Sequence, residues 1–214
     1  MPDRLTPTTL ARAVDALARG DDAIAASVER FGVPPLWERE PSFGTLVHLI
    51  LEQQVSLASA LAAYRRLVEA SGGAPTPSSF MRFDDAELRT IGFSRQKAGY
   101  ARDLALALND GFDLAALGAM TDDEVRTALT RLRGIGRWTA DVFLTMCMLR
   151  PDVWPRGDRG LAVGVAEMLS LAVVPEDGEL EGIAARWRPF RAVAARVCWN
   201  HYLGVRGRLA APLA

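Results

Sequence analysis

The segment "LRGIGRWTADVF" (residues 132–143) places two glycines around one isoleucine, directly before an apolar run of helical character. Gly134 and Gly136 allow backbone conformations that a side chain would forbid, so we expect a tight corner between two helices. The N–H groups at the start of the second helix lack intrahelical partners and carry the positive end of the helix dipole. They could bind a phosphate, with Arg137 adding a charge and Thr139 a hydroxyl donor. Taken alone, the same residues also fit an ordinary glycine corner between two helices.

A second candidate for chemistry is Asp158, in the irregular stretch "WPRGDRG" that follows. Its position before a helical segment is typical of an N-cap. Capping would fix the carboxylate and keep it ionised, so a structural role and a role as a reactive anion are compatible. Asp152 and Asp141 are other acids nearby, and we interpret Asp141 as a polar position on the helix after the corner.

The elements that must position these residues are helices. The chain shows no convincing alternation of the kind that strands require, and we predict roughly ten helices of ordinary length. Asp84 with Glu87, and Thr121 with Glu124, have the spacing of capping boxes. The segment at residues 42–73 is too long and too mixed for a single helix, and we expect it to break at "EQQVS" (residues 52–56).

Composition limits the possible classes. The chain has 214 residues, half of them apolar, and a net charge of −1, which neither favours nor excludes a nucleic-acid partner because binding needs only a local basic face. Two cysteines and two histidines exclude a four-cysteine cluster and disfavour a structural zinc site. Lys97 is the only lysine. The apolar runs are too short for a bilayer and no secretion leader is evident, so we expect no membrane segment and a reducing cytoplasm.

Five segments in one order carry a resemblance to a known family. Together they resemble the helix–hairpin–helix (HhH-GPD) DNA glycosylase superfamily, and most closely its 3-methyladenine DNA glycosylase II subfamily. The segments are "FGTLVHLILEQQVSLASA", "LRTIGFSRQKAGYARDLALAL", "LRGIGRWTA", "DVWPRGDRGL" and "RWRPFRAVAARVCWNHY".

The resemblance implies an all-α fold of two helical lobes with the active-site cleft between them. One lobe would consist of residues 1–40 and 160–214. The other, residues 41–159, would carry the helix–hairpin–helix at about residues 121–149 and the aspartate loop at residues 150–159.

The resemblance also implies the chemistry. The chain would flip alkylated bases, such as 3-methyladenine and 7-methylguanine, out of damaged double-stranded DNA and hydrolyse the N-glycosidic bond, without a cofactor. Asp158 matches the catalytic aspartate, which stabilises positive charge on the sugar as the base leaves. The lysine of bifunctional relatives falls where this chain has Trp138, and Lys97 lies elsewhere, so a monofunctional enzyme without β-lyase activity is expected.

A base pocket of aromatic side chains suits cationic alkylated bases through stacking and cation–π attraction. The resemblance places Trp138 and Trp199 in this pocket. We expect Trp154, a further aromatic near the aspartate, and Gln53 to line it as well. Core packing is the alternative for each tryptophan, nearly even for Trp199, and it is our interpretation for Trp37 and Trp187. Val142 and Gly160 replace bulkier residues of the family and indicate a roomier pocket, so the range of lesions stays open.

The remaining expectations concern DNA. Gln54 would fill the gap left by the flipped base, although a polar turn packed inside the protein is almost as good an interpretation. The backbone clamp would comprise Gly134, Ile135, Gly136, Arg137 and Thr139, and no metal is required, although a monovalent cation on hairpin carbonyls around Arg133–Gly136 would be compatible. We expect a monomer in a bacterial-type cytoplasm, acting on nucleoid-associated DNA. The alternatives are a non-catalytic helix–hairpin–helix DNA-binding module and a glycosylase for oxidised or mispaired bases.

Overall fold

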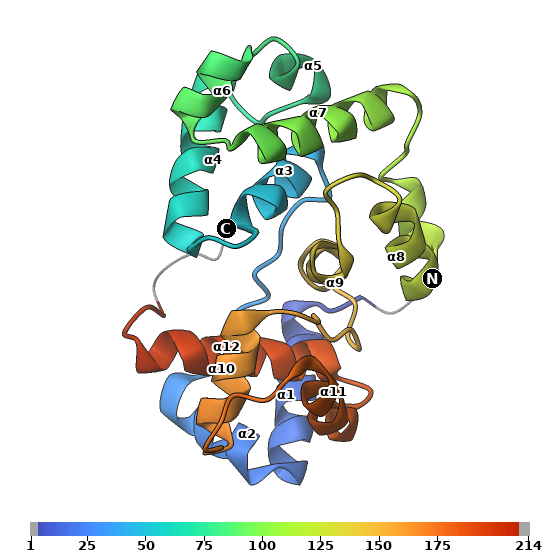
Figure 1. The fold of residues 1–214 in the computed structure, drawn as a ribbon. Helices are drawn as coiled ribbons and strands as arrows, with labels where there is room; N and C mark the ends of the chain where they lie inside the picture. Colours follow the sequence, from blue (N-terminus) through green and yellow to red (C-terminus); the bar gives the residue numbers. More distant parts are fainter. Residues whose placement is uncertain (1–3, 210–214) are drawn as a thin grey trace. The chain divides into compact units, whose positions relative to one another are not determined.

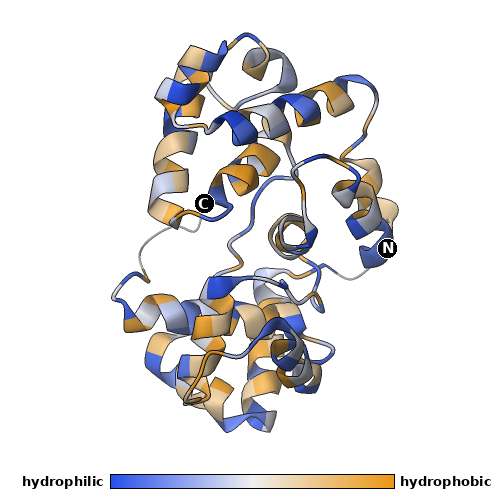
Figure 2. Ribbon diagram, in the orientation of Figure 1, coloured by the Kyte–Doolittle hydropathy of each residue, from blue (hydrophilic) through white to orange (hydrophobic). Residues whose placement is uncertain are grey.

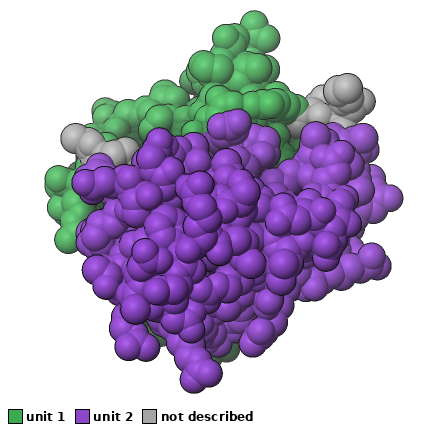
Figure 3. Space-filling model, turned by 90° about the horizontal axis from the view of Figure 1, so that it is seen from above, with its two compact units in different colours: residues 1–38, 144–213 green, residues 39–143, 214 purple. Residues whose placement is uncertain are grey.

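The computed structural model describes residues 4–209, and the regular structure within that range is entirely helical, without a strand (Figure 1). The expected all-α class is therefore confirmed. The described residues divide into two compact units, one formed by residues 4–38 and 144–209 and the other by residues 39–143 (Figure 3). Among the described helices, none combines the length and the hydrophobicity that crossing a membrane requires.

The first unit contains helices from both ends of the chain. They are α1 (Pro7–Gly20), α2 (Asp22–Phe31), α10 (Arg159–Met168), α11 (Asp177–Ala184), the short 3₁₀ helix η2 (Ala185–Trp187) and α12 (Arg191–Val205). Helix α12 packs against α1, α2 and α10. Gly164 of α10 allows this close packing, since a Cβ there would lie 2.4 Å from the carbonyl oxygen of Cys198. A larger residue at this position would force α10 and α12 apart.

The second unit contains the middle of the chain. Its helices are α3 (Phe43–Glu52), α4 (Leu57–Ser71), α5 (Pro77–Phe80), α6 (Asp85–Ile91), α7 (Arg95–Asn109), the 3₁₀ helix η1 (Ala116–Ala119) and α8 (Asp122–Thr130). Helix α9 (Arg137–Met146) begins in this unit and passes the division between residues 143 and 144. Every residue of α3 is buried, and Figure 2 shows it mainly in hydrophobic colours. It packs against α4 and α7 and forms the centre of this unit.

The local signals in the sequence are found at the expected helix ends. The Asp84 carboxylate accepts a hydrogen bond from the Glu87 N–H, and the Glu87 carboxylate accepts one from the Asp84 N–H, both at 2.8 Å. Thr121 and Glu124 form the same reciprocal cap at the start of α8. The break expected at residues 52–56 separates α3 from α4. These three predictions are confirmed.

The division at residue 143 differs from the boundary after residue 159 that we expected. The loop at residues 150–159 belongs to the unit of the chain ends because its side chains contact that unit. Arg191 of α12 donates from Nε and Nη2 to the Asp152 carboxylate, each at 2.9 Å. Trp154 packs against Trp187 with 5.7 Å between ring centroids. The aspartate loop is therefore part of the same compact unit as α10 and α12.

Candidate functional site

Helices α8 and α9 form the expected helix–corner–helix, and the two glycines of the corner have different roles. Gly134 has a φ of +85°, and a Cβ there would lie 2.2 Å from Cγ of Tyr100 on α7. Both the backbone conformation and the available space therefore exclude a side chain. Gly136 is exposed and a Cβ there would meet nothing within 4 Å. A phosphate could approach the backbone at Gly136, whereas Gly134 serves the packing of the corner on α7.

Two residues expected in the backbone clamp are buried in the same unit. Ile135 is 4% exposed and Thr139 is 1% exposed. The Thr139 hydroxyl accepts a hydrogen bond from Nε2 of Gln53 at 3.2 Å. It therefore faces the protein interior, which does not fit the phosphate contact that we expected of Thr139. Ile135 anchors the corner by burial, so its backbone is the part that can face a ligand.

A buried carboxylate joins the two helices of the hairpin. Asp141 of α9 accepts hydrogen bonds from Nε of Arg126 on α8 at 2.6 Å and from Nε of Arg137 at 2.9 Å. Burial alone would lower the pKa of Arg126, but its hydrogen bonds to Asp141 and Asp123 and the nearby negative charge raise it. The Arg137 side chain keeps about half of its surface exposed. Asp141 thus holds Arg137 beside the corner, where it can add charge to a phosphate site.

The segment between α3 and α4 is tied to both α7 and the hairpin. Nζ of Lys97 donates to the carbonyl oxygens of Leu51 and Gln53, at 2.7 and 2.8 Å. Nε2 of Gln53 donates to the carbonyl oxygen of Gly134 at 2.8 Å. The Gln53 amide therefore points at the hairpin corner, which does not fit a wall of a base pocket. Gln54 is exposed, as a side chain that enters a base stack must be.

Asp158 is held at the start of α10. Its Oδ1 accepts hydrogen bonds from the backbone N–H of Leu161 at 2.7 Å and from Nε1–H of Trp199 at 3.3 Å. The expected capping role of Asp158 is confirmed. The carboxylate is thereby fixed between the N-terminus of α10 and a tryptophan of α12, and it is partly exposed.

Two further aromatic rings on the same unit lie near this carboxylate or its tryptophan partner. Trp199 is 6% exposed and meets Trp37 edge to face, with 6.4 Å between centroids. A Cβ added at Gly160 would lie 3.4 Å from Oδ1 of Asp158 and 3.9 Å from Cε1 of Tyr202. Neither Trp37 nor Tyr202 was anticipated as a neighbour of the aspartate. The sequence could have indicated Tyr202, because it follows Trp199 by three residues and so lies on the same face of the helix.

The other predicted pocket tryptophans differ in burial. Trp154 is 4% exposed and packs on Trp187, whose Nε1 donates to Oδ2 of Asp21 at 2.9 Å. Trp154 is therefore a core residue, and its predicted place in a base pocket does not fit this burial. The structural role predicted for Trp187 is confirmed. Trp138, in the first turn of α9, is half-buried.

Both histidines make contacts within the protein that are typical of a structural role. Nδ1 of His201 lies 3.0 Å from Oγ of Ser27. The His48 ring stacks on Tyr64 at 4.3 Å, and burial together with the charge of Arg39 lowers the pKa of His48 to about 4. Within residues 4–209, no cluster of three or more histidine, cysteine or acidic side chains has a geometry that could hold a metal ion.

The carbonyls of residues 133–136 were named as a compatible site for a monovalent cation. The Gly134 oxygen accepts from Gln53 and the Gly136 oxygen accepts from Ala140 at 3.1 Å. Each carbonyl oxygen has two lone pairs, so these bonds leave it able to bind a cation as well. A monovalent cation at the corner therefore stays a prediction.

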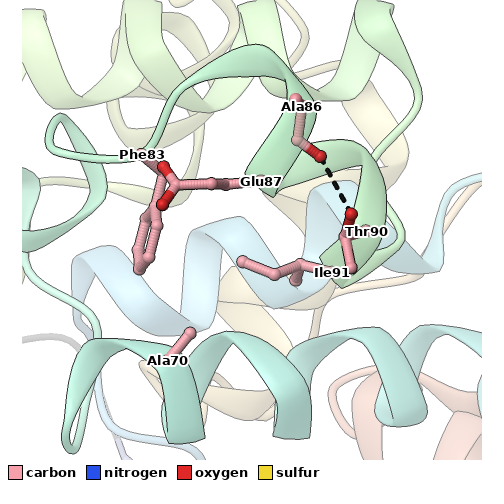
Figure 4. Close-up of a pocket in the computed structure, with 6 residues that line it drawn as sticks. All are labelled: Ala70, Phe83, Ala86, Glu87, Thr90 and Ile91. Atoms are coloured by element: carbon pink, nitrogen blue, oxygen red, sulfur yellow. Dashed lines mark hydrogen bonds between the residues drawn. The ribbon is translucent and has the colours of Figure 1, made fainter.

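A separate pocket of about 380 Å³ lies in the second unit (Figure 4). Its lining consists of Ala70, Phe83, Ala86, Glu87, Thr90 and Ile91. The Thr90 hydroxyl is used within the wall, where it donates to the Ala86 carbonyl at 3.1 Å. The pocket contains none of the predicted site residues, and we assign no chemistry to it.

Known proteins share both the sequence and the arrangement of this chain. The family model described as "HhH-GPD superfamily base excision DNA repair protein" matches residues 47–191. DNA-3-methyladenine glycosylase 1 of Schizosaccharomyces pombe is 27% identical over 167 residues, which cover 76% of this chain and 73% of the relative. A DNA-3-methyladenine glycosylase of Bacillus subtilis is 24% identical over 202 residues, covering 86% and 65%. This chain spans between 60% and 73% of the length of four such curated relatives.

A solved structure shows the same fold. The 3-methyladenine DNA glycosylase Mag1 of fission yeast, in complex with abasic DNA, matches with a TM-score of 0.83 and 25% identity, covering 91% of this chain and 97% of that one. The family match extends from α3 through the hairpin and Asp158 to the start of α12. The chain therefore belongs to the HhH-GPD superfamily of base-excision DNA repair proteins.

Proposed function

We propose that this protein is a monofunctional DNA glycosylase of the 3-methyladenine DNA glycosylase II type, which removes alkylated bases from duplex DNA by hydrolysing the N-glycosidic bond. The observation that carries the proposal is the fixed carboxylate of Asp158, which accepts from the Leu161 N–H and the Trp199 indole. The names of the relatives support alkylated bases as the substrate class. We further propose that the protein acts as a monomer in the cytoplasm on nucleoid-associated DNA.

In the proposed reaction, the bond between C1′ and the base nitrogen breaks, and its electron pair leaves with the base. A base methylated at N3 or N7 of a purine carries a positive charge and leaves as a neutral molecule, so it needs no proton from a general acid. Positive charge builds on the deoxyribose as the bond lengthens, and the Asp158 carboxylate stabilises it electrostatically. Water then bonds to C1′, and its proton passes to Asp158 or to solvent.

The hairpin would supply affinity that is independent of DNA sequence. The first backbone bond within α9 is from the Ala140 N–H to the Gly136 carbonyl, so the N–H groups before Ala140 lie at the positive end of the helix. Gly136 leaves room for a phosphate oxygen to reach them. Arg137, held by Asp141, adds a charge at the same point. Such contacts position a protein on duplex DNA without reading bases.

The absence of lyase activity is proposed from the lysine chemistry. A β-lyase of this superfamily needs an uncharged lysine to attack C1′, and the sequence contains only Lys97. Its ammonium group donates to the Leu51 and Gln53 carbonyls. The attack position after the corner is occupied by Trp138. A Schiff base between the abasic sugar and a lysine at the attack position is therefore not expected.

The test is incubation with methylated duplex DNA, with released bases and strand cleavage measured separately. We expect 3-methyladenine or 7-methylguanine in solution and intact strands. Cleavage together with release would overturn the lysine argument. If methylated bases stay in place, release from an oxidised or mispaired duplex would favour the corresponding alternative, and duplex binding alone would favour a DNA-binding module.

The matched variants are Asp158→Asn and Asp177→Asn. Asparagine caps helices as well as aspartate does, so Asp158→Asn should keep the fold and the affinity for abasic DNA. We expect its single-turnover excision rate to fall by about 10²-fold or more, the usual effect of removing a key electrostatic stabiliser. Asp177 bonds to the Gly157 N–H of the same loop at 3.1 Å, and its replacement should leave the rate unchanged. Full activity of Asp158→Asn would refute the catalytic assignment.

A further inference from the structure

The segment between α3 and α4 holds an unusual backbone conformation at an exposed residue. Gln54 has a φ of +57°, in the left-handed region that residues other than glycine rarely adopt. Such a conformation persists only where the surroundings enforce it. Residues 54–59 are all exposed, so burial of the segment itself does not enforce it. Two large apolar side chains, Val55 and Leu57, are also exposed there, at 47% and 44%.

Lys97 fixes the start of this segment from α7. The last carbonyl groups of a helix have no intrahelical partner and carry the negative end of its dipole, so they favour a cation. Nζ of Lys97 occupies that position at the end of α3, with bonds to Leu51 and Gln53 at 2.7 and 2.8 Å. A solvated side chain would not be ordered in this way, and burial lowers the pKa of Lys97.

Gln53 links the same segment to the hairpin corner. Its carbonyl accepts from Lys97, while its side-chain amide donates to the Gly134 carbonyl and to Oγ1 of Thr139. Gln53 is therefore held at its main chain by α7 and at its side chain by the hairpin corner. Gln54 follows directly, so its position relative to the corner is set by these bonds within one compact unit.

We infer that Lys97 and Gln53 form a brace that holds residues 54–57, the segment that would fill the base stack, at a fixed distance from the proposed phosphate-binding corner at residues 134–137. Lys97 is then a positioning residue for base flipping. The inference rests on the proposed function, because a flipped base is what the segment would replace. Insertion into a base stack requires an apolar or long side chain at a defined depth below the phosphates. The brace supplies that depth before DNA is bound, so binding at the corner directs Gln54, Val55 and Leu57 toward the same step of the duplex.

The variants separate the brace from a general structural role. Lys97→Met removes both bonds and keeps the apolar stem, and Lys97→Arg restores donors to the two carbonyls. Gln53→Glu keeps the bonds of Lys97 but turns an oxygen toward the Gly134 carbonyl, which breaks the link to the corner. Arg102→Met is the matched control, since Arg102 also lies on α7 and donates to a backbone carbonyl, that of Phe83 at 2.9 Å, away from this segment.

The first readout does not depend on chemistry. A duplex with a tetrahydrofuran abasic analogue opposite 2-aminopurine becomes more fluorescent when a side chain enters the stack and displaces that base. We expect the wild-type chain to raise the fluorescence, Lys97→Met and Gln53→Glu to abolish most of the rise, and Lys97→Arg to recover it in part. Affinity of the two Lys97 variants for undamaged duplex should stay within about twofold, because their hairpin backbone contacts are intact. Excision of methylated bases should fall about 10- to 100-fold, as expected for a misplacement of about 1 Å.

Each outcome decides one question. If the wild-type chain raises the fluorescence, Lys97→Met loses that rise and the wild type releases no alkylated base, the proposed function fails and the brace stands. If Lys97→Met matches the wild type or Arg102→Met in fluorescence and rate, the brace is refuted. An equal loss of affinity for undamaged duplex would also refute it, because Lys97 would then support phosphate binding in general. Should Lys97→Met not fold, Gln53→Glu carries the same test.

Discussion

The two acids that share Arg126 should differ sharply in their contribution to stability. Asp141 is fully buried and bonds to Nε of Arg126 at 2.6 Å, whereas Asp123 is 91% exposed and bonds to Nη1 at 2.7 Å. The guanidinium of Arg126 thus has two carboxylate partners at nearly equal distances, one buried and one exposed. Asp141→Asn and Asp123→Asn make the same chemical change, and the two sites differ in burial and in the second partner of Asp141, Arg137.

The structure sets the expected magnitudes. Removing one partner of a buried ion pair costs about 3–5 kcal/mol, since the other charge stays buried without compensation. The Arg126 side chain is 14% exposed and retains Asp123, so we expect the lower end, about 3 kcal/mol, for Asp141→Asn. The second pair of Asp141, with the half-exposed Arg137, adds at most about 1 kcal/mol. Asp123→Asn should change the free energy of unfolding by less than about 0.5 kcal/mol.

Urea unfolding, followed by circular dichroism, measures this difference. With a slope of about 2 kcal/mol per molar urea, a loss of 3 kcal/mol lowers the midpoint by roughly 1.5 M. Asp123→Asn should leave the midpoint nearly in place. Equal small shifts in the two variants would refute the reasoning, because they would mean that burial of Asp141 does not strengthen its bond to Arg126. Equal large shifts would refute it too.

Three further predictions test other contacts. Gly134→Ala should lower stability by more than about 1–2 kcal/mol because it combines a positive φ with a clash, whereas Gly136→Ala should keep the melting temperature and weaken binding to every duplex sequence alike. Trp199→Phe, which removes the 3.3 Å bond to Asp158, should slow single-turnover excision about tenfold without changing duplex affinity. The pKa of His48 in the folded chain, about 4, lies below the unfolded value of 6.5, so the unfolded state takes up a proton first as the pH falls. The free energy of unfolding therefore keeps its full value above pH 6.5 and decreases as the pH drops toward 4. Between pH 7.5 and pH 5 the wild type should lose about 2 kcal/mol more than His48→Phe in urea titrations.

Local features of the sequence predicted the parts of the structure that depend on neighbouring residues. The capping pairs at Asp84 and Thr121, the break at residues 52–56 and the cap by Asp158 each depend on contacts within a few positions. Such contacts follow from residue type and spacing alone. The all-α class followed for the same reason, because helical periodicity is a local property.

The expectations that did not fit depend on pairs distant in sequence. Thr139 had the right type for a phosphate donor, but its hydroxyl accepts a hydrogen bond from Gln53, directly after α3. Trp154 had the right type for a base pocket, but Trp187 covers its ring. Lys97 could equally have lain on a solvated face, and only its bonds to the end of α3 give it a role. None of these partners could be predicted from spacing, since each contact joins segments that are distant in sequence and meet only in the folded chain.

The net charge of −1 is also explained by how the charges are distributed. This chain has only one lysine, and that lysine is engaged with helix carbonyls. Its corner would instead use backbone N–H groups and a helix dipole, which add no formal charge. The neighbouring arginines Arg126 and Arg137 are matched by Asp141, so they are held in place without raising the total. An almost neutral chain can therefore carry the proposed phosphate site, because preorganised backbone dipoles can attract a phosphate without adding formal charge.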